Sequence, residues 1–327
     1  MATCERYHYH AFELRWLSEG LPIPELPHAQ TNGDWAAQEG NIRILEEDPL
    51  CWPQLAPGAH DTPFLEMARG DLRLTVEGIG YFRIHNGEQI AWQRARENVS
   101  DQDLRTFLLG SAVGALLIQR GILVLHGNAL ERDGQAIVCL GHSGAGKSTL
   151  AYALMRQGWR LLADDLVAIT PDGQVLPGIP RIKLWHDAVK AFGLDPDALP
   201  PIRQGMQKYL LLGEAIERAE RPCPLKALYL IRQQRRDIDD PDDSRIARIN
   251  RQQQATLCLR NQAFRPRFVR GLAQEGANFI ALARLQQTVP LASLPMPQGI
   301  PEMQNWLQSQ SLLTAAAEAS SSEGQAT

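Results

Sequence analysis

Alternation of apolar and polar residues gives the chain its first clear pattern. Apolar residues occupy every second position at 72–76, and further apolar runs follow at 79–84 and 89–92. A period of two residues is the repeat of a half-buried β-strand, and Asn86-Gly87 between the last two runs is typical of a tight hairpin. We therefore expect a small antiparallel sheet, within a β-rich N-terminal domain that covers residues 1–99.

A helical period replaces the strand period at Ser100. Ser100 and Asp103 have the spacing of a helix cap, and apolar residues then recur at helical spacing as far as Gln119. The segment is apolar nearly all round, which is typical of a buried helix, and Gly121 follows as a stop signal. We predict a buried helix over 100–120 that connects the N-terminal domain to a second domain.

Beyond this helix, short apolar runs alternate with helical segments. Strands are expected at 122–125, 137–140 and 159–163, and a helix is expected at 150–155, between the second and the third strand. Such alternation is typical of the α/β class, and we place this domain at 121–312. The Ala-, Ser- and Glu-containing residues 313–327 have the composition of a disordered tail.

Composition restricts the partners and the compartment. The net charge of −4, from 33 basic and 37 acidic residues, does not favour binding to nucleic acid or to an anionic membrane. The five cysteines are scattered and include no Cys-x-x-Cys pair, which favours a reducing compartment. The N-terminus lacks the apolar core of a signal peptide, and no apolar run reaches the ~18 residues of a membrane span. We expect a cytoplasmic protein.

The turn between the second strand and the next helix is rich in glycine. Its spacing, Gly141-x-x-x-x-Gly146-Lys147-Ser148, matches a phosphate-binding loop in a strand–loop–helix setting. In such a loop the backbone N–H groups and the helix N-terminus bind phosphate. Lys147 would neutralise the outer phosphates, and the Ser148 hydroxyl would bind Mg²⁺. The alternative is a glycine-rich turn between two core elements. The residues assigned to the nucleotide are Gly141, His142, Ser143, Gly144, Ala145, Gly146, Lys147, Ser148 and Thr149.

A pair of acids follows the loop at short range. Asp164 lies 17 residues after Lys147, which leaves room for one helix and one strand, so Asp164-Asp165 should end the next strand. Strand ends in an α/β sheet share one edge, where ligands bind. We predict that the two acids share the metal-binding and proton-accepting roles, with the metal assigned to Ser148 and Asp165. The alternative is an Asp-Asp turn or helix cap.

Further candidates surround this core set. His126 ends the preceding strand and points to the same crevice, although a structural hydrogen-bonding role is the simpler alternative. Arg203 and Lys208 lie in a loop and are candidate lid cations for the charge of the transition state. Arg181 and Lys183 are candidates for contact with the substrate. We expect the His142 side chain, within the glycine-rich loop, to face outward, and we assign no chemistry to it.

Two other clusters admit a metal hypothesis. His8 and His10 would share one face of a strand, and five aspartates gather in the segment 237–243. No third ligand accompanies the histidines, and the acidic segment lacks the calcium-loop pattern. We favour an exposed strand face and a solvated loop.

Several of these motifs together resemble the catalytic domain of HPr kinase/phosphorylase. They are Leu125-His126-Gly127, the loop 141–149 and Leu162-Ala163-Asp164-Asp165; the segment 178–185 also looks like HPr-kinase-related proteins, some of which act on serine in precursor peptides. The resemblance implies a mixed-sheet P-loop fold similar to phosphoenolpyruvate carboxykinase, preceded by a smaller β-rich domain. It also implies that Lys147, Ser148, Asp164 and Asp165 serve nucleotide, metal and proton transfer, with His126 at the active site.

The resemblance has a limit after the acidic pair. Bifunctional members carry a Glu-Arg-Gly-type signature there, whereas this chain has Pro177-Gly178-Ile179-Pro180. The resemblance therefore supports a kinase reaction. It supports neither phosphorolysis nor HPr as the acceptor.

Together these features predict a kinase that uses ATP and Mg²⁺ to phosphorylate a hydroxyl, with serine of a protein or peptide as the acceptor. A kinase for a small metabolite is one alternative. A nucleotide-binding regulatory module with little catalysis is another. The resemblance also implies a homo-oligomer, and no feature points to nucleic acid or membrane as a partner.

Overall fold

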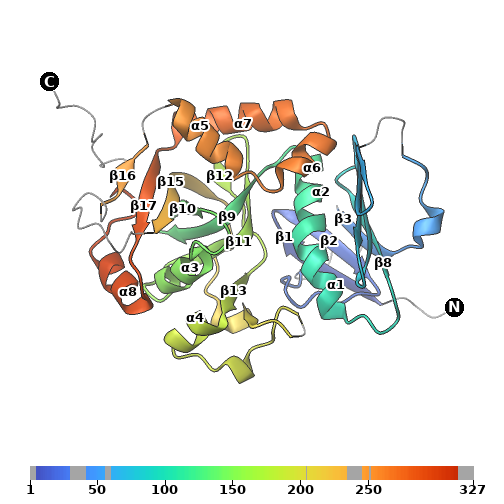
Figure 1. Ribbon diagram of the computed structural model, residues 1–327, viewed down its shortest axis with the longest axis horizontal. Coiled ribbons are helices and arrows are strands. Elements are labelled where there is room, and N and C mark those ends of the chain that lie inside the picture. The colour runs from blue at the N-terminus through green and yellow to red at the C-terminus, as the bar shows by residue number, and fades with distance from the viewer. Residues whose placement is uncertain are drawn as a thin grey trace. The chain divides into compact units, whose positions relative to one another are not determined.

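The computed structural model describes residues 5–29, 42–55, 60–203, 205–233, 245–249 and 252–315. The aspartate-rich segment 237–243 lies outside these residues. The chain divides into two compact units, each built from segments that are distant in sequence (Figure 1). Unit 1 comprises Met1–Val124, Ile202–Met206 and Arg265–Asn278, and unit 2 comprises Leu125–Pro201, Gln207–Phe264 and Phe279–Thr327.

Unit 1 contains an eight-stranded sheet in the order β1-β2-β3-β8-β7-β6-β5-β4. Its strands are β1 (Arg6–Ala11), β2 (Leu14–Glu19), β3 (Ile42–Glu46), β4 (His60–Thr62), β5 (Leu65–Ala68), β6 (Asp71–Val76), β7 (Gly80–His85) and β8 (Gln89–Arg94), with a 3₁₀ turn at Pro49–Cys51.

The predicted hairpins of this sheet are confirmed, because β6, β7 and β8 pair antiparallel. Asn86 and Gly87 both have positive φ, as the tight turn requires. The sheet is larger than the small antiparallel sheet predicted, and it is mixed, because β3 pairs in parallel with both β2 and β8. Those pairings join strands that are far apart in sequence, so no local pattern reveals them.

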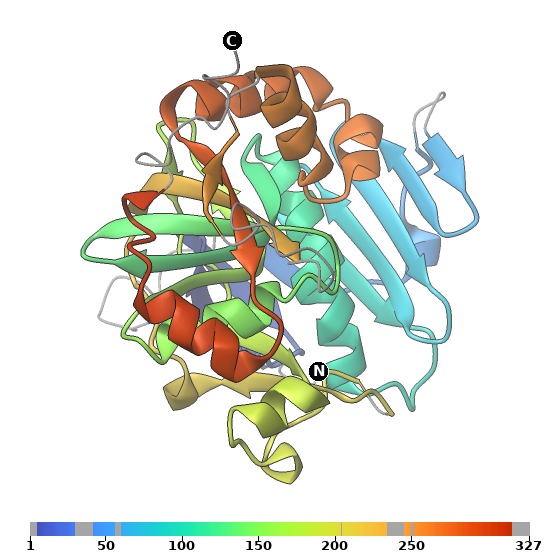
Figure 2. The ribbon, with the colours of Figure 1, turned by 60° about the vertical axis from the view of Figure 1, so that its left-hand side comes forward.

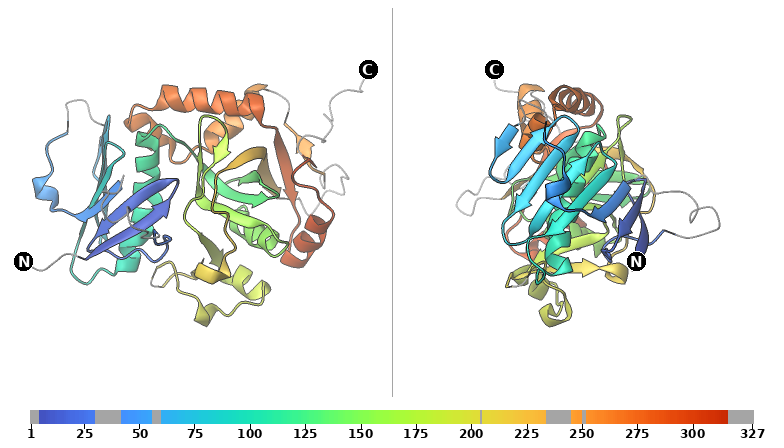
Figure 3. Two further views of the ribbon diagram at one scale, coloured as in Figure 1. Left: turned by 180° about the vertical axis from the view of Figure 1, so that it is seen from behind. Right: turned by 90° about the vertical axis from the view of Figure 1, so that its right-hand side faces the viewer.

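A long helix packs on β7 and β8 of this sheet (Figure 3). It consists of α1 (Asp101–Phe107), a π-turn (Leu108–Ala112) and α2 (Val113–Gln119). The predicted cap is confirmed, because the Asp103 N–H donates to Ser100 Oγ at 3.1 Å, and Gly121 ends the helix with a φ of 73°. The short helix α6 (Pro266–Gly271) also belongs to unit 1.

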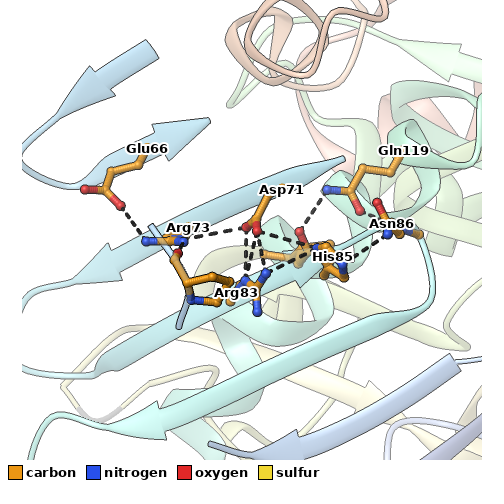
Figure 4. A network of polar contacts seen from close by, with 10 residues as sticks. Glu66, Asp71, Arg73, Arg83, His85, Asn86 and Gln119 are labelled. Carbon is orange, nitrogen blue, oxygen red and sulfur yellow. Dashed lines mark hydrogen bonds and ion pairs between the residues drawn. The ribbon is translucent and has the colours of Figure 1, made fainter. Parts of the chain in front are cut away.

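A buried ion pair ties β6 to β7 in unit 1 (Figure 4). Arg73 and Arg83 are directly opposite each other in the register, and two like charges so placed would destabilise the pairing. The Asp71 carboxylate accepts from Arg83 Nη2 at 2.6 Å and lies 3.8 Å from Arg73 Nε. His85 Nδ1 is 3.5 Å from the same carboxylate. Asp71 thus offsets the repulsion between the two guanidinium groups.

Unit 2 is built on a seven-stranded mixed sheet. Its strands are β9 (Leu123–Arg132), β10 (Gln135–Leu140), β11 (Arg160–Ile169), β12 (Gln174–Val175), β15 (Cys223–Gln233), β16 (Ala247–Arg248) and β17 (Leu291–Met296). Strands β10, β15 and β17 are parallel neighbours, and β9 forms a hairpin with β10. The mixed α/β class predicted from the sequence is confirmed.

A smaller antiparallel sheet and five helices complete unit 2. The small sheet pairs β13 (Arg181–Trp185) with β14 (Lys208–Leu212). The helices are α3 (Lys147–Met155), α4 (His186–Ala191), α5 (Gln252–Asn261), α7 (Glu275–Thr288) and α8 (Ile300–Gln308), with 3₁₀ turns at Pro196–Ala198 and Gly213–Ala215. The residues of α7 up to Asn278 belong to unit 1. Figure 2 shows α8 beside α3. Within the described part of the chain, no helix is long and apolar enough to cross a bilayer.

Two strand ends differ from the sequence prediction. His126 and the Asp164-Asp165 pair were expected at strand ends, but β9 continues to Arg132 and β11 continues to Ile169. These polar side chains can occupy strand interiors because other groups of the fold bind them, as described next.

Candidate active site

The glycine-rich loop connects β10 to α3. Gly144 and Gly146 have φ of 85° and 88°, a region that glycine enters without the steric cost of a Cβ. A Cβ at Gly141 would lie 3.2 Å from the Ala145 Cβ, so glycine is also needed where the loop closes on itself. The Gly141 N–H donates to the Gln262 side chain at 3.1 Å, which holds the loop entry in place.

The Lys147 side chain contacts the backbone of this loop. Its buried ammonium donates to the carbonyl oxygens of Gly141 at 2.8 Å and His142 at 3.0 Å. Burial lowers the pKa of Lys147, while the nearby Asp165 and Asp164 carboxylates oppose that shift. The His142 side chain is exposed, in agreement with the prediction that it faces outward.

Asp164 is buried on β11 and faces the loop. Its Oδ1 accepts from Ser148 Oγ at 3.2 Å and from Asn128 Nδ2, and its Oδ2 accepts from the Lys183 N–H at 3.1 Å. Burial and the neighbouring Asp165 raise the pKa of the Asp164 carboxyl to about 6. The structure therefore brings Ser148 to Asp164, whereas the sequence assignment paired Ser148 with Asp165.

Asp165 adopts a backbone conformation that is unusual for a strand. Its φ is 71°, so the two successive carboxylates both reach the same neighbour. Asp164 binds the Lys183 N–H, and Asp165 forms an ion pair with the Lys183 ammonium. Burial by itself would raise the pKa of Asp165, but the Lys183 charge outweighs burial and lowers it below the usual range. Asp165 is thus the carboxylate of the pair that stays ionised.

His126 lies next to this pair, half-buried on β9. Its Nδ1 is 3.3 Å from the Asp165 carbonyl oxygen. Burial, together with the Lys147 charge, lowers the pKa of His126, so the imidazole is neutral near neutral pH.

The predicted cations divide between the two units. Lys183 and the buried Arg181 lie on β13, where the charge of Arg181 favours the ionised form of Asp165. Lys208 begins β14, and its charge acts on both Lys147 and Asp164. Arg203 belongs to unit 1, where it forms an ion pair with Asp103 at 3.6 Å and stacks on Phe107.

A pocket of about 420 Å³ adjoins the loop. The parallel strands β10 and β17 end at the same edge of the sheet, so the residues after β17 come beside the loop. The lining residues are Gly144, Ala145, Gly146, Thr149, Met296, Pro297, Gln298, Gly299, Ile300 and Met303.

Asn128 is a polar residue of this site that the sequence did not single out. Its Nδ2 donates to Asp164, while its Oδ1 is buried with no hydrogen-bond partner in the described part of the chain. The available signal was its position two residues after His126 on one strand, which places both polar side chains on the same face.

Comparison with known proteins finds relatives of part of the chain. Over 71 residues the chain is 38% identical to an HPr kinase/phosphorylase of Clostridium beijerinckii, a match covering 21% of this chain and 24% of that protein. Over 52 residues it is 42% identical to an HPr kinase/phosphorylase of Caldanaerobacter subterraneus, covering 16% of this chain and 17% of that protein. A segment of the chain is HPr-kinase-like. The likeness predicted from the motifs is thereby confirmed, and the chain spans only 17–24% of the length of these relatives.

A structural comparison adds little to this likeness. The Hpr(Ser) kinase/phosphatase structure from Coxiella burnetii matches 57% of this chain and 93% of its own, with 13% identity and a TM-score of 0.25. No family model matches the chain.

Proposed function

We propose that this protein is a Mg²⁺-dependent kinase that transfers the γ-phosphate of ATP to a hydroxyl, with serine of a protein or peptide as the acceptor. The observation that carries the proposal is the 3.2 Å contact between Ser148 Oγ and Asp164 Oδ1. This contact joins the glycine-rich loop to the carboxylate pair, so a phosphate-binding element and a proton-accepting element form one site. The similarity to HPr kinase/phosphorylases supports the same reaction class.

The loop and Lys147 would bind the triphosphate. The first turn of α3, a helix of nine residues, presents backbone N–H groups that favour an anion. The Lys147 ammonium binds two loop carbonyls, and a phosphate oxygen is a stronger partner for a charged donor than a carbonyl oxygen. ATP would therefore draw Lys147 from the loop carbonyls onto the outer phosphates.

The donor set beside the loop fits a magnesium ion. Three oxygens there are ligands of the kind that Mg²⁺ prefers: Ser148 Oγ, Asp164 Oδ1 and the buried Asn128 Oδ1, to which no described residue donates a hydrogen bond. We assign the metal to Ser148 and Asp164, with Asn128 beside them. When bound, the ion neutralises charge on the phosphate oxygens.

Asp165 is the better candidate for the proton acceptor. Lys183 keeps its carboxylate ionised, and His126 lies against its backbone. In the transfer, the acceptor O–H bond breaks and its proton passes to Asp165. The acceptor oxygen forms a bond to the γ-phosphorus, and the bond from the γ-phosphorus to the bridging oxygen of ADP breaks.

The pocket beside the loop suits the nucleoside. Its lining includes Thr149, which follows the metal-binding Ser148, and apolar side chains from Met296, Ile300 and Met303. Small-molecule sites combine an apolar lining with a few polar groups. In this arrangement the phosphates extend from the pocket, across the loop and toward the carboxylate pair.

The proposal is tested by calorimetric titration of ATP in the presence of Mg²⁺. Losing charged hydrogen bonds to phosphate costs about 1.5–3 kcal/mol, so Lys147→Ala should bind ATP roughly 10- to 100-fold more weakly. The matched control is Lys190→Ala, which removes an exposed lysine at the end of α4. Equal ATP affinity in the wild type and in Lys147→Ala would refute the proposed site.

A further inference from the structure

One face of the small β13–β14 sheet connects the carboxylate pair to an exposed indole. Lys183 and Trp185 are two residues apart on β13 and so share a face, and Trp185 is directly opposite Lys208 in the register. The Lys208 ammonium lies 5.3 Å from the centre of the Trp185 ring. We call Lys183, Trp185 and Lys208 the cationic strand face.

This face begins at the reacting groups. The Lys183 N–H binds Asp164 and its ammonium pairs with Asp165. Lys208 is close enough for its charge to act on both Asp164 and Lys147. With a rise of about 3.3 Å per residue, Trp185 is about 7 Å along the strand from Lys183. The face is therefore one short step from the point where we place phosphate transfer.

The cationic strand face is also separate from the proposed nucleoside pocket. None of its three residues lines the pocket that we assign to the nucleoside. Trp185 is 55% exposed, which is unusual for so large an apolar side chain. An exposed indole beside the proposed transfer site and away from the nucleoside pocket indicates contact with the other substrate.

The charges of this face indicate what that substrate carries. The Lys183 ammonium is already paired with Asp165. Lys208, in contrast, has no carboxylate partner among the described residues and is held over the indole ring. An ammonium so placed attracts an anion, and the flat ring beside it offers apolar contact area.

We propose that the cationic strand face binds an extended acceptor polypeptide that has an acidic side chain two residues from the phosphorylated hydroxyl. An extended segment has the same rise and the same alternation as β13, so side chains at i and i+2 reach Asp165 and Lys208 together. The carboxylate of the acidic residue pairs with Lys208, and the adjoining chain lies on Trp185. This inference rests on the proposed kinase function and defines its substrate class.

A peptide array tests this inference. Each peptide contains one serine in a Gly/Ala background, with a single Asp scanned from three residues before the serine to three residues after it, and [γ-³²P]ATP serves as the donor. We expect the highest kcat/KM for Asp two residues from the serine, by about 10-fold over the peptide without Asp. Lys208→Ala should remove that preference, and Lys208→Glu should favour Lys at the same position.

Control variants separate the two substrates. Trp185→Ala should raise the KM for the peptide and leave the KM for ATP unchanged. Lys226→Ala removes an exposed lysine of β15 and should leave the Asp preference intact. An array with no positional preference would overturn the inference while the proposed function stands. Labelling of small hydroxylated metabolites but of no peptide would overturn both the inference and the serine acceptor, and would leave ATP-dependent phosphate transfer standing. Absence of ATP turnover with every acceptor would instead contradict the proposed function.

Discussion

Replacing Asp164 with asparagine should stabilise the fold at neutral pH while it removes activity. Asp164 is buried next to a second carboxylate, and its pKa is raised from 3.8 to about 6. For such a group the folded state holds the proton more tightly than the unfolded state. Its contribution to stability is therefore fully present below pH 4 and is lost as the pH rises to about 6.

The raised pKa sets the size of this effect. A shift of about two pKa units corresponds to about 3 kcal/mol, of which about 2–3 kcal/mol develops between pH 4 and pH 7.5. Asparagine also loses an acceptor for the Lys183 N–H, which costs about 1 kcal/mol at every pH. The difference in unfolding free energy between Asp164→Asn and the wild type should thus rise by about 2–3 kcal/mol over this interval.

Urea denaturation of both proteins at about pH 4, pH 6 and pH 7.5 measures this difference. Asp165→Asn is the matched control. The pKa of Asp165 is lowered by the Lys183 charge in spite of burial, so its carboxylate is ionised at all three pH values, and its removal should cost nearly the same stability at each of them. Parallel pH dependences of the unfolding free energy for the wild type and Asp164→Asn would refute a raised pKa of Asp164 in the folded state.

Three further substitutions test other parts of the structure. Asp71→Ala leaves the buried Arg83 charge uncompensated and should cost about 3–5 kcal/mol of unfolding free energy. The double variant Asp71→Ala/Arg83→Met should recover most of that loss, and a double variant as unstable as the single one would contradict this role. Gly146→Ala should lose about 1 kcal/mol to backbone strain and weaken ATP binding, whereas Gly158→Ala, with a similar φ and open space around it, should lose stability alone. Ile300→Trp should fill the pocket beside the loop and weaken ATP binding about 10-fold in calorimetry, and Ile300→Leu should not; unchanged affinity in the tryptophan variant would place the nucleoside elsewhere.

Local patterns were sufficient to predict that the glycine-rich loop and the acidic pair lie close together. The glycine-rich loop and the Asp164-Asp165 pair are short motifs, and one helix and one strand separate them, so their proximity follows from chain geometry. The capped helix that begins after Ser100 was equally predictable, because the cap and the apolar spacing are local.

The different environments of the two aspartates were not predictable in the same way. They depend on the positive φ of Asp165 and on Lys183, which reaches both carboxylates from another strand. The side-chain oxygen of Asn128 is a candidate metal ligand only because the fold buries it where no described residue donates a hydrogen bond to it. The pocket depends on residues after β17, which come beside the loop through strand pairings between distant segments.

The same limit explains the N-terminal sheet. The β6–β8 hairpins carry their own turn signals, whereas the parallel pairings of β3 with β2 and β8 do not. The predicted domain boundaries at residues 99, 120 and 312 stay predictions.

Transfer of labelled phosphate tests the central claim most directly. The full chain is incubated with [γ-³²P]ATP and the serine peptide array, with and without Mg²⁺, and the labelled amino acid is identified after hydrolysis. The proposed function predicts phosphoserine that requires Mg²⁺ and is absent from reactions with Lys147→Ala. Labelled serine formed equally well by Lys147→Ala, or ATP turnover that labels no hydroxyl, would contradict it.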